Sequence, residues 1–200
     1  MLDHVFTDAI DALAQSLETA LLERLAIDEH LNTDVLSGDL TFETSYGLLG
    51  EEVPPRVRAD VSLVWSTWSQ SAFRDWYVGD GFSEPPRIDI EITLRVQRLA
   101  TPPDVPQLLT ATPAQGPSVG GEVLYRAGPT VEQSFGRDLR MVTSAFEIAY
   151  GATYELDEQS LEDSALIDVQ FTSLGGWIAA ALVKLNDLGL TYAPANAEDL

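Results

Sequence analysis

The clearest hydrophobic pattern lies at the start of the chain, where apolar residues recur at spacings of three and four. Acidic and polar residues fill the positions between them. This spacing is typical of an amphipathic helix, and it predicts one over residues 1–28. The apolar positions are Leu2, Phe6, Ile10, Leu13, Leu17, Leu21 and Leu25.

Farther along the chain, apolar and polar residues alternate one by one, which predicts β-strands with one buried and one wetter face. The clearest runs are 57–65, 88–96, 139–150 and 167–172, and two shorter candidates are 40–46 and 122–126. We therefore expect a sheet built from residues 39–100 and 122–173. Because such alternation is the habit of antiparallel sheets, we expect mostly antiparallel pairing.

Helical spacing returns between Trp177 and Leu188, and Gly189 is a natural C-terminal cap. This pattern predicts a short helix over 176–189, followed by a polar tail over 190–200. A length of 200 residues fits one domain. The sequence thus predicts a single α+β domain with a long N-terminal helix, a mostly antiparallel sheet of about five to seven strands and a short C-terminal helix.

Residues 101–121 interrupt the pattern with a concentration of proline and glycine. A run of about twenty residues without regular structure is long for a compact domain and is often functional. Because prolines favour an extended conformation, we expect an arm, which either packs on another subunit or serves as a plain solvent-exposed connector. The prolines are Pro102, Pro103, Pro106, Pro113 and Pro117.

Charge adds the most to this picture. The chain has 32 Asp and Glu residues against 11 Lys and Arg residues, which gives a net charge of −21. Such a surface argues against nucleic acid as a tightly held partner. Molar salt screens the self-repulsion, so we expect a halophilic protein, with an ordinary acidic protein as the alternative. The apolar share of 45% is enough for a folded core.

Few residues are candidates for chemistry. Cysteine is absent, which excludes thiolate nucleophiles and Cys-ligated metals. Residues 116–120 match the GxSxG pattern, but no strand–elbow–helix pattern surrounds them, and His4 and His30 both precede the serine, against the hydrolase order. The acidic cluster over 155–168 lacks the order of an EF-hand. We therefore expect no catalytic residues, no metal, no cofactor and no enzymatic activity.

Aromatic residues gather between positions 65 and 82. Trp65 belongs to the apolar face of its strand, which places Trp68 on the opposite face. Exposed Trp and Tyr side chains beside an arginine are typical anchors of protein interfaces. We expect either a contact surface or a further layer that covers these side chains. The candidate interface residues are Trp68, Phe73, Arg74, Trp76 and Tyr77, together with the five prolines of 101–121.

The opening residues 2–13, continuing to Leu17, Leu21 and Leu25, resemble the first helix of tail terminator proteins. Those proteins occur in tailed viruses and related contractile injection systems. In that layout the runs 57–68 and 87–99 are sheet strands, and 101–121 is an arm between subunits. The resemblance covers the first half of the chain, leaves the region after Gly121 without a match, and carries no catalytic residues.

The resemblance implies a structural virion protein that forms a ring, commonly a hexamer, stops tail-tube growth and joins the tube to the neck. Its partners would be further copies of itself and the tail tube and connector proteins. DNA would pass through without specific binding, because a lumen lined with carboxylates repels phosphates. We expect a location in the virion and no membrane segment. Two alternatives are a tail tube protein of the same kind of particle and a halophilic α+β enzyme or small-ligand-binding domain.

Overall fold

Eight strands and five helices make up the part of the chain that the structure describes. The structure is a computed structural model, and it describes residues 4–21, 26–48, 54–79, 81–137 and 139–194. The helices are α1 (His4–Ala20), α2 (Thr67–Tyr77), α3 (Val105–Ala111), α4 (Glu158–Glu162) and α5 (Ser164–Asn186). The strands are β1 (Asp28–Thr33), β2 (Leu40–Gly47), β3 (Val57–Trp65), β4 (Arg87–Leu99), β5 (Gln115–Val119), β6 (Glu122–Arg126), β7 (Thr130–Phe135) and β8 (Met141–Glu155).

The strands form one antiparallel sheet in the order β1-β2-β3-β4-β8-β6-β5, and β7 also pairs with β8. β8 is the longest strand. β4 lies along one of its edges, and β7 and β6 pair with successive parts of the other edge. This arrangement confirms the predicted α+β class, the N-terminal and C-terminal helices and the antiparallel pairing. The strand number is eight, slightly above the expected range.

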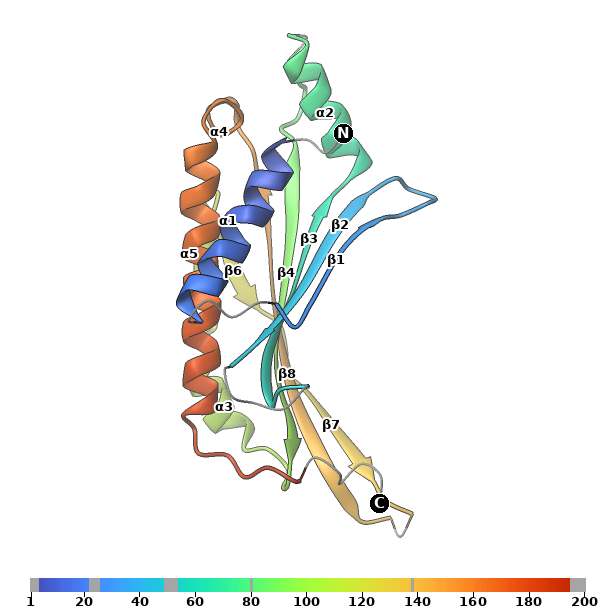
Figure 1. Ribbon diagram of the computed structural model, residues 1–200, viewed down its shortest axis with the longest axis vertical. Coiled ribbons are helices and arrows are strands. Elements are labelled where there is room, and N and C mark those ends of the chain that lie inside the picture. Colours follow the sequence, from blue (N-terminus) through green and yellow to red (C-terminus); the bar gives the residue numbers. More distant parts are fainter. Residues whose placement is uncertain (1–3, 22–25, 49–53, 80, 138, 195–200) are drawn as a thin grey trace.

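The hydrophobic core lies between one face of the sheet and the helices α1 and α5 (Figure 1). Every second residue of β3 and of β4 is buried in it, as the alternation predicted. Phe6 of α1 stacks on Trp65 of β3 with ring centroids 6.1 Å apart, and Phe171 of α5 meets Tyr154 of β8 at 5.8 Å. Each such buried side chain contributes about 1.5–3 kcal/mol to folding, so this layer holds the molecule together.

The two long helices, α1 and α5, pack tightly against each other at Gly175. A Cβ atom there would lie 2.7 Å from Ser16 Oγ and 3.2 Å from the Leu13 carbonyl oxygen, so only glycine fits. Ser16 Oγ also donates a hydrogen bond to the Thr172 carbonyl oxygen at 2.7 Å. By length and composition, α5 is the one helix among the described residues that could cross a membrane. Its buried side packs on α1 and the sheet, which is the pattern of a core helix.

The predicted strand over 167–172 is wrong, because these residues lie inside α5. Ile167 and Phe171 are buried, whereas Val169 between them is 65% exposed. Positions four apart share one face of a helix, and positions two apart do not. The core-facing residues therefore follow helical spacing. α5 has 23 residues, and the short helix expected over 176–189 corresponds only to its second half.

The prediction of a structureless arm over 101–121 is also wrong. Asp104 caps the N-terminus of α3 through its side chain, and Pro106 lies in the first turn, where a helix has no partner for an N–H. Leu108 and Val119 are fully buried, and both α3 and β5 pack against α5 of the same subunit. Deleting this segment would therefore remove part of the core.

Other boundaries also differ from the predictions. The helix expected over 1–28 corresponds to α1, whose last residue is Ala20; residues 1–3 and 22–25 lie outside the described residues, and Asp28 already begins β1. All residues of β1 and β7 are exposed, so no alternation marks either strand. α2 follows β3 directly and lies at the end of the sheet (Figure 1). Its cap is Ser66, whose side chain accepts a hydrogen bond from the Ser69 N–H.

Candidate interaction surface

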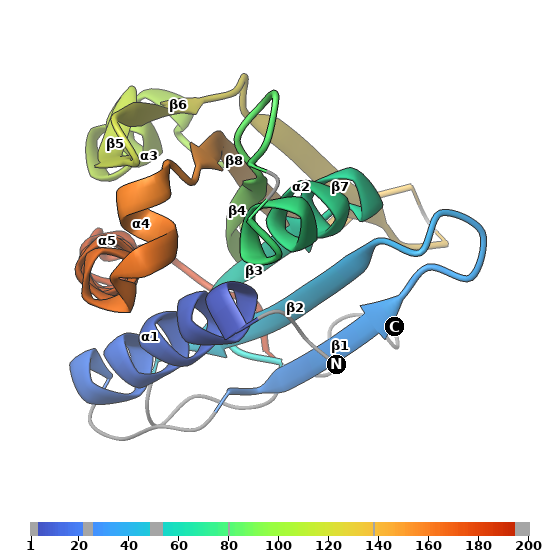
Figure 2. The same ribbon diagram turned by 90° about the horizontal axis from the view of Figure 1, so that it is seen from above.

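Among the described residues, no helix layer covers the face of the sheet opposite α1 and α5 (Figure 2), and we call it the open face. Seen from above, the β1–β2 and β7–β8 hairpins both extend away from α1 and α5, so the sheet curves around this face (Figure 2). Its side chains are the polar half of the alternation, and the strand register sets them in rows. In one row, Glu43 lies beside Ser62, Ser62 beside Glu91, and Glu91 beside Gly151.

Two hollows of about 340 Å³ each lie on the open face. Ser62 and Glu91 line both hollows, so together they form one groove that runs across the strands from β1 to β8. Small residues such as Ser62, Ala149 and Gly151 leave the room that the groove occupies. The lining residues are Asp28, His30, Glu43, Thr44, Ser45, Asp60, Val61, Ser62, Val64, Asp89, Ile90, Glu91, Thr93, Ala127, Ala149, Tyr150 and Gly151.

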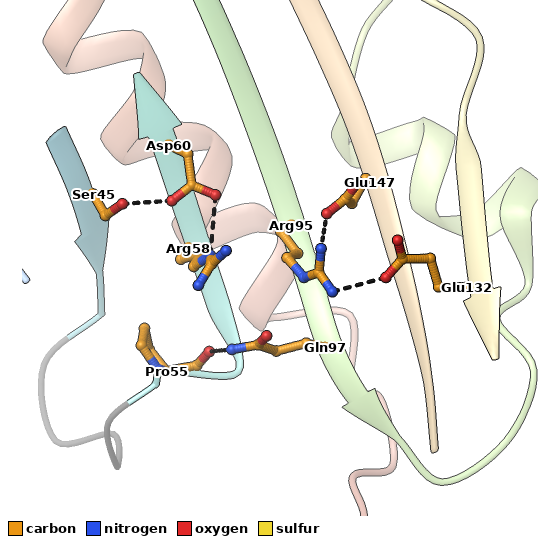
Figure 3. A network of polar contacts seen from close by, with 8 residues as sticks. All are labelled: Ser45, Pro55, Arg58, Asp60, Arg95, Gln97, Glu132 and Glu147. Atoms are coloured by element: carbon orange, nitrogen blue, oxygen red, sulfur yellow. Dashed lines mark hydrogen bonds and ion pairs between the residues drawn. The ribbon is translucent and has the colours of Figure 1, made fainter. Parts of the chain in front are cut away.

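Five side chains of the groove carry a carboxylate, and none of the described residues that line it is Lys or Arg. Asp60 accepts hydrogen bonds from Ser45 Oγ at 2.5 Å and from Arg58 Nε at 3.0 Å (Figure 3). Asp89 accepts a hydrogen bond from Thr153 Oγ1 at 2.9 Å. These two carboxylates therefore already have partners within the subunit.

Two other carboxylates of the groove have no partner in the described part of the chain. Glu43 and Glu91 are both exposed, and neither takes part in a side-chain hydrogen bond or an ion pair there. They flank Ser62 from strands on either side of β3, which sets their Cα atoms about 10 Å apart. At the β1 end of the groove, His30 Nε2 lies 2.8 Å from Asp28 Oδ1. The groove thus offers negative charge that the subunit does not neutralise.

An ion cluster beside the groove ties three strands together on the open face. Arg95 of β4 pairs with Glu132 of β7 at 2.9 Å and also with Glu147 of β8 (Figure 3). Arg58 of β3 lies directly opposite Arg95 of β4. Because the two guanidinium groups carry like charges, each needs its own carboxylate. Because the Arg95 side chain is largely buried, salt screens this cluster less than it screens exposed pairs.

The turn between β1 and β2 holds two apolar side chains out in solvent. Val35 and Leu36 are almost fully exposed, the latter at 98%. The Asp34 carboxylate fixes the turn by accepting hydrogen bonds from the backbone N–H groups of Ser37 at 2.7 Å and Leu36 at 2.8 Å. The same hydrogen bonds hold the pKa of Asp34 below its usual value. The turn is thus a defined projection.

The turn between β7 and β8 is the second projection, and it combines apolar and basic residues. The Gly136 N–H donates to the Arg140 carbonyl oxygen at 2.9 Å, and the Leu139 N–H donates to the Gly136 carbonyl oxygen at 3.0 Å. Leu139 has a φ of 61° and is 84% exposed. Arg137, Arg140 and Phe135 are also exposed.

The aromatic residues singled out from the sequence lie on α2 and divide into two groups. Phe73 is buried, with its ring centroid 6.4 Å from that of Trp65. Trp68 is 41% exposed, with the Arg87 guanidinium 5.4 Å from its ring centroid, and Tyr77 is 73% exposed. Trp68 does not lie on the opposite face of the sheet, because the chain leaves the sheet after Trp65 and begins α2.

The remaining predicted interface residues are spread over the molecule. On α2, Arg74 is exposed and Trp76 is partly buried against the core. Of the prolines, Pro102, Pro106 and Pro113 are exposed, and Pro103 and Pro117 are half-buried. Figure 1 places α2 and α3 at opposite ends of the molecule, so the structure does not bring these two sets together. Their role at an interface stays a prediction.

A third hollow, of about 330 Å³, lies between α1 and α5 and is lined by Asp8, Asp11 and Asp168. Burial raises the pKa of Asp8 above its usual value, and the negative charges of Asp168 and Asp11 raise it further, against the lowering effect of His4. Within the described ranges, no group of three or more His, Asp or Glu side chains is arranged to hold a metal ion. This hollow therefore concentrates negative charge without a ligand set.

The groove is not among the sites predicted from the sequence, although part of its lining follows the predicted alternation. The polar positions of the runs 57–65 and 88–96 include Asp60, Ser62, Asp89 and Glu91, and the alternation by itself predicts only a wetter face there. Comparison with protein-family models, curated proteins and solved structures finds no match for this chain.

Proposed function

We propose that the protein is a ring-forming structural component of a tailed-virus particle, a tail terminator or neck protein that joins the tail tube to the head connector. One observation carries the proposal: two unlike hairpins project from the sheet with exposed apolar ends. The β1–β2 turn exposes Val35 and Leu36, and the β7–β8 turn exposes Phe135 and Leu139. Two-stranded ribbons are marginal in water by themselves, and clustered exposed apolar side chains are typical of contact sites.

The positions of the hairpins favour head-to-tail association. β1 forms one edge of the sheet, whereas β7 lies along the far edge of β8. Residues 141–143 of β8 pair with β7 but not with β4. The end of this hairpin therefore extends past the region where β8 pairs with β4. Contacts between two different patches are heterologous, and they generate closed rings when the rotation between subunits closes.

The charge also supports a role around DNA. A ring of subunits that each carry a net charge of −21 repels phosphates, so DNA would pass through a central channel without being held. The proposed partners are copies of the same chain, a hexamer in the simplest case, and the tail tube and connector proteins. The proposed location is the virion, assembled in a high-salt host cytoplasm.

A second candidate, a tail tube protein of the same kind of particle, is favoured by the same two projecting hairpins. Hairpins that contact neighbouring rings as well as neighbouring subunits would stack rings into a tube. The third reading, an enzyme or a small-ligand-binding domain, would use the groove as its site. The groove lies open along an uncovered sheet face, and its lining combines five carboxylates with apolar residues at the β8 end, whereas small-molecule sites are mostly enclosed and apolar.

The test is the mass of the purified protein in molar KCl, followed by particle imaging. We expect a discrete oligomer whose images show a ring with a central hole. Tubes that lengthen with protein concentration would instead identify the tail tube protein. A strict monomer at every salt concentration would overturn the proposal and favour the ligand-binding reading.

A further inference from the structure

Two strands of the sheet, β1 and β7, have an outer edge without a partner strand in the described part of the chain. β1 pairs there only with β2, and β7 pairs only with β8. Every residue of both strands is exposed, and their backbone groups make no further hydrogen bond among the described residues. Each strand therefore carries a row of unused N–H and C=O groups, to which another strand can add.

The remaining end strand, β5, is protected in a way that β1 and β7 are not. Pro117 lies in the middle of β5 and has no N–H to donate, the register of β5 with β6 is irregular between Gln115 and Ser118, and β5 packs against α5. By contrast, β1 has no proline and pairs with β2 without irregularity, and β7 has no proline and is regular over residues 130–134. Because proteins commonly block sheet edges that stay in solvent, two unblocked edges indicate a partner strand.

On β1, the backbone groups that point outward can be assigned. The Asp34 N–H donates a hydrogen bond to the Asp39 carbonyl oxygen at 2.9 Å, which makes positions 34 and 39 a hydrogen-bonded pair. Along an antiparallel ladder, such pairs alternate with pairs whose N–H and C=O groups point away from the neighbouring strand. The register of β1 with β2 therefore directs the backbone groups of Glu29, Leu31 and Thr33 to the free edge.

Exposed apolar side chains of the two strands lie on the same face of the sheet. Leu31 lies opposite Phe42 on β2, and Val131 lies opposite Phe146 on β8. Directly opposed residues share a face, and Phe42 and Phe146 both belong to the core. Leu31 and Val131, which are 48% and 41% exposed, are therefore on the face that the helices cover. If the two edges met, these side chains would bury part of their apolar surface against each other.

Charge distinguishes the strand pairs that two copies could form. β1 carries Asp28 and Glu29, so two copies of β1 side by side would set two carboxylates from each subunit along one contact, which is unfavourable. The single charged residue of β7 is Glu132, and Arg95 already pairs with it at 2.9 Å. The acidic β1 therefore meets less repulsion at β7 than at a second β1.

The strand directions fit a head-to-tail contact. Five antiparallel pairings lead from β1 through β2, β3, β4 and β8 to β7, so β1 and β7 run in opposite directions. A second copy in the same orientation therefore places its β7 antiparallel to β1 of the first. The helix-covered faces of the two sheets then lie on the same side.

We propose that β1 of one subunit pairs edge to edge with β7 of a second copy, as antiparallel strands that join the two sheets. The pairing rests on the proposed ring function, and it specifies how neighbouring subunits meet. β1 and β7 are different edges of one chain, so each subunit uses both and the contact is heterologous. In strand addition, main-chain hydrogen bonds give the affinity and the side chains beside them give the specificity, here Leu31 and Val131.

Proline substitution tests the main-chain part of the contact. Leu31→Pro removes an N–H that points outward, so the pairing of β1 with β2 can persist. The matched variant Leu31→Thr removes the apolar side chain but keeps the N–H. The readout is the oligomer mass against protein concentration, at the salt concentration where the wild-type protein assembles, and melting curves establish that each variant is folded. We expect Leu31→Pro to weaken assembly by at least about tenfold and Leu31→Thr to weaken it less.

Cross-linking tests which strands meet, and it does not depend on the proline variant. The chain has no cysteine, so Leu31→Cys with Val131→Cys introduces the only two thiols. A short bis-maleimide should join them between subunits and give a ladder of covalent oligomers on a denaturing gel. The control combines Leu31→Cys with Val169→Cys, at an exposed position of α5, and should give no ladder. Leu31→Cys alone should remain a single chain on the gel.

Three results would overturn the pairing, and they are distinguishable. If the wild-type protein assembles but the paired cysteines do not link, or Leu31→Pro assembles as well as the wild-type protein, the two edges do not meet although the ring stands. Covalent dimers of Leu31→Cys alone would show that β1 meets β1 instead. If the wild-type protein is monomeric at every salt concentration, the ring function itself fails, and the pairing with it.

Discussion

At the scale of single residues, the position of each arginine explains its role better than the net charge of the chain does. Most arginines stabilise the fold of their own subunit: Arg126, for example, donates to the Thr112 and Leu109 carbonyl oxygens and so ties β6 to the end of α3. Arg56 and Arg87 lie over the rings of Tyr192 and Trp68. Arg140, in the turn between β7 and β8, likewise interacts within the chain.

Asp8 offers a residue-scale prediction with a definite dependence on pH. Burial raises its pKa in the folded protein above the ordinary value of 3.8, so ionised Asp8 favours the unfolded chain at neutral pH, and this penalty disappears as the pH falls below the unfolded pKa. We therefore expect Asp8→Asn to raise the melting temperature by about 1 °C at pH 7 and to have no effect near pH 3.

The matched control for this prediction is Asp75→Asn, which removes an exposed carboxylate on α2 and so changes the net charge equally. Melting curves of both variants over a pH series decide the outcome. A gain for Asp8→Asn no larger than that of Asp75→Asn would mean that the environment of Asp8 carries no special penalty.

At the scale of elements, the contact between α1 and α5 depends on one glycine of an adjacent pair. A Cβ at Gly175 would lie 2.7 Å from Ser16 Oγ, whereas nothing lies within 4 Å of a Cβ at Gly176. We expect Gly175→Ala to lower the free energy of unfolding by about 1–3 kcal/mol, because the helices must separate. We expect Gly176→Ala to raise it by up to about 1 kcal/mol through helix propensity.

Urea unfolding of the two glycine variants measures both effects in the same helix. The additional change Ser16→Gly should recover part of the loss in Gly175→Ala, since it removes the atoms that clash. Equal stabilisation by both alanines would contradict the close approach of α1 and α5.

The same elements show what could be predicted from the sequence and what could not. α1, β3 and β4 were predicted because their buried residues repeat over many positions, with periods of 3.6 or 2. The strand predicted over 167–172 is wrong because a window of six residues is too short to separate the two periods. Ile167, Val169 and Phe171 fit both. β1 has no buried residue and is a strand only through its hydrogen bonds to β2. The groove could not be predicted from the sequence, because it depends on the pairing of β2, β3 and β4. This pairing brings Glu43 and Glu91 to the two sides of Ser62.

At the scale of the whole molecule, the excess of carboxylates is spread over a surface that has few cations to balance it. The described part of the chain forms ion pairs at Arg58 and Arg95, and one between His30 and Asp28. Most of the 32 acidic residues therefore interact mainly with solvent and with one another. Assembly of several such subunits multiplies this repulsion, so salt should control both folding and association.

Repulsion between these carboxylates should make the stability of the folded protein depend on salt, which can be measured. Raising KCl from about 0.1 M to molar concentration shortens the Debye length from about 10 Å to about 3 Å, which screens most repulsion between exposed carboxylates. We expect the melting temperature to rise steadily over this range. Salts also strengthen apolar burial, so the specific test is a variant with fewer charges. In this variant four exposed carboxylates are neutralised: Glu158, Glu162, Asp168 and Asp187. We expect it to have a higher melting temperature at low salt and a smaller rise of the melting temperature with KCl. A melting temperature that is flat or falls with salt in the wild-type protein would contradict the expected adaptation to high salt.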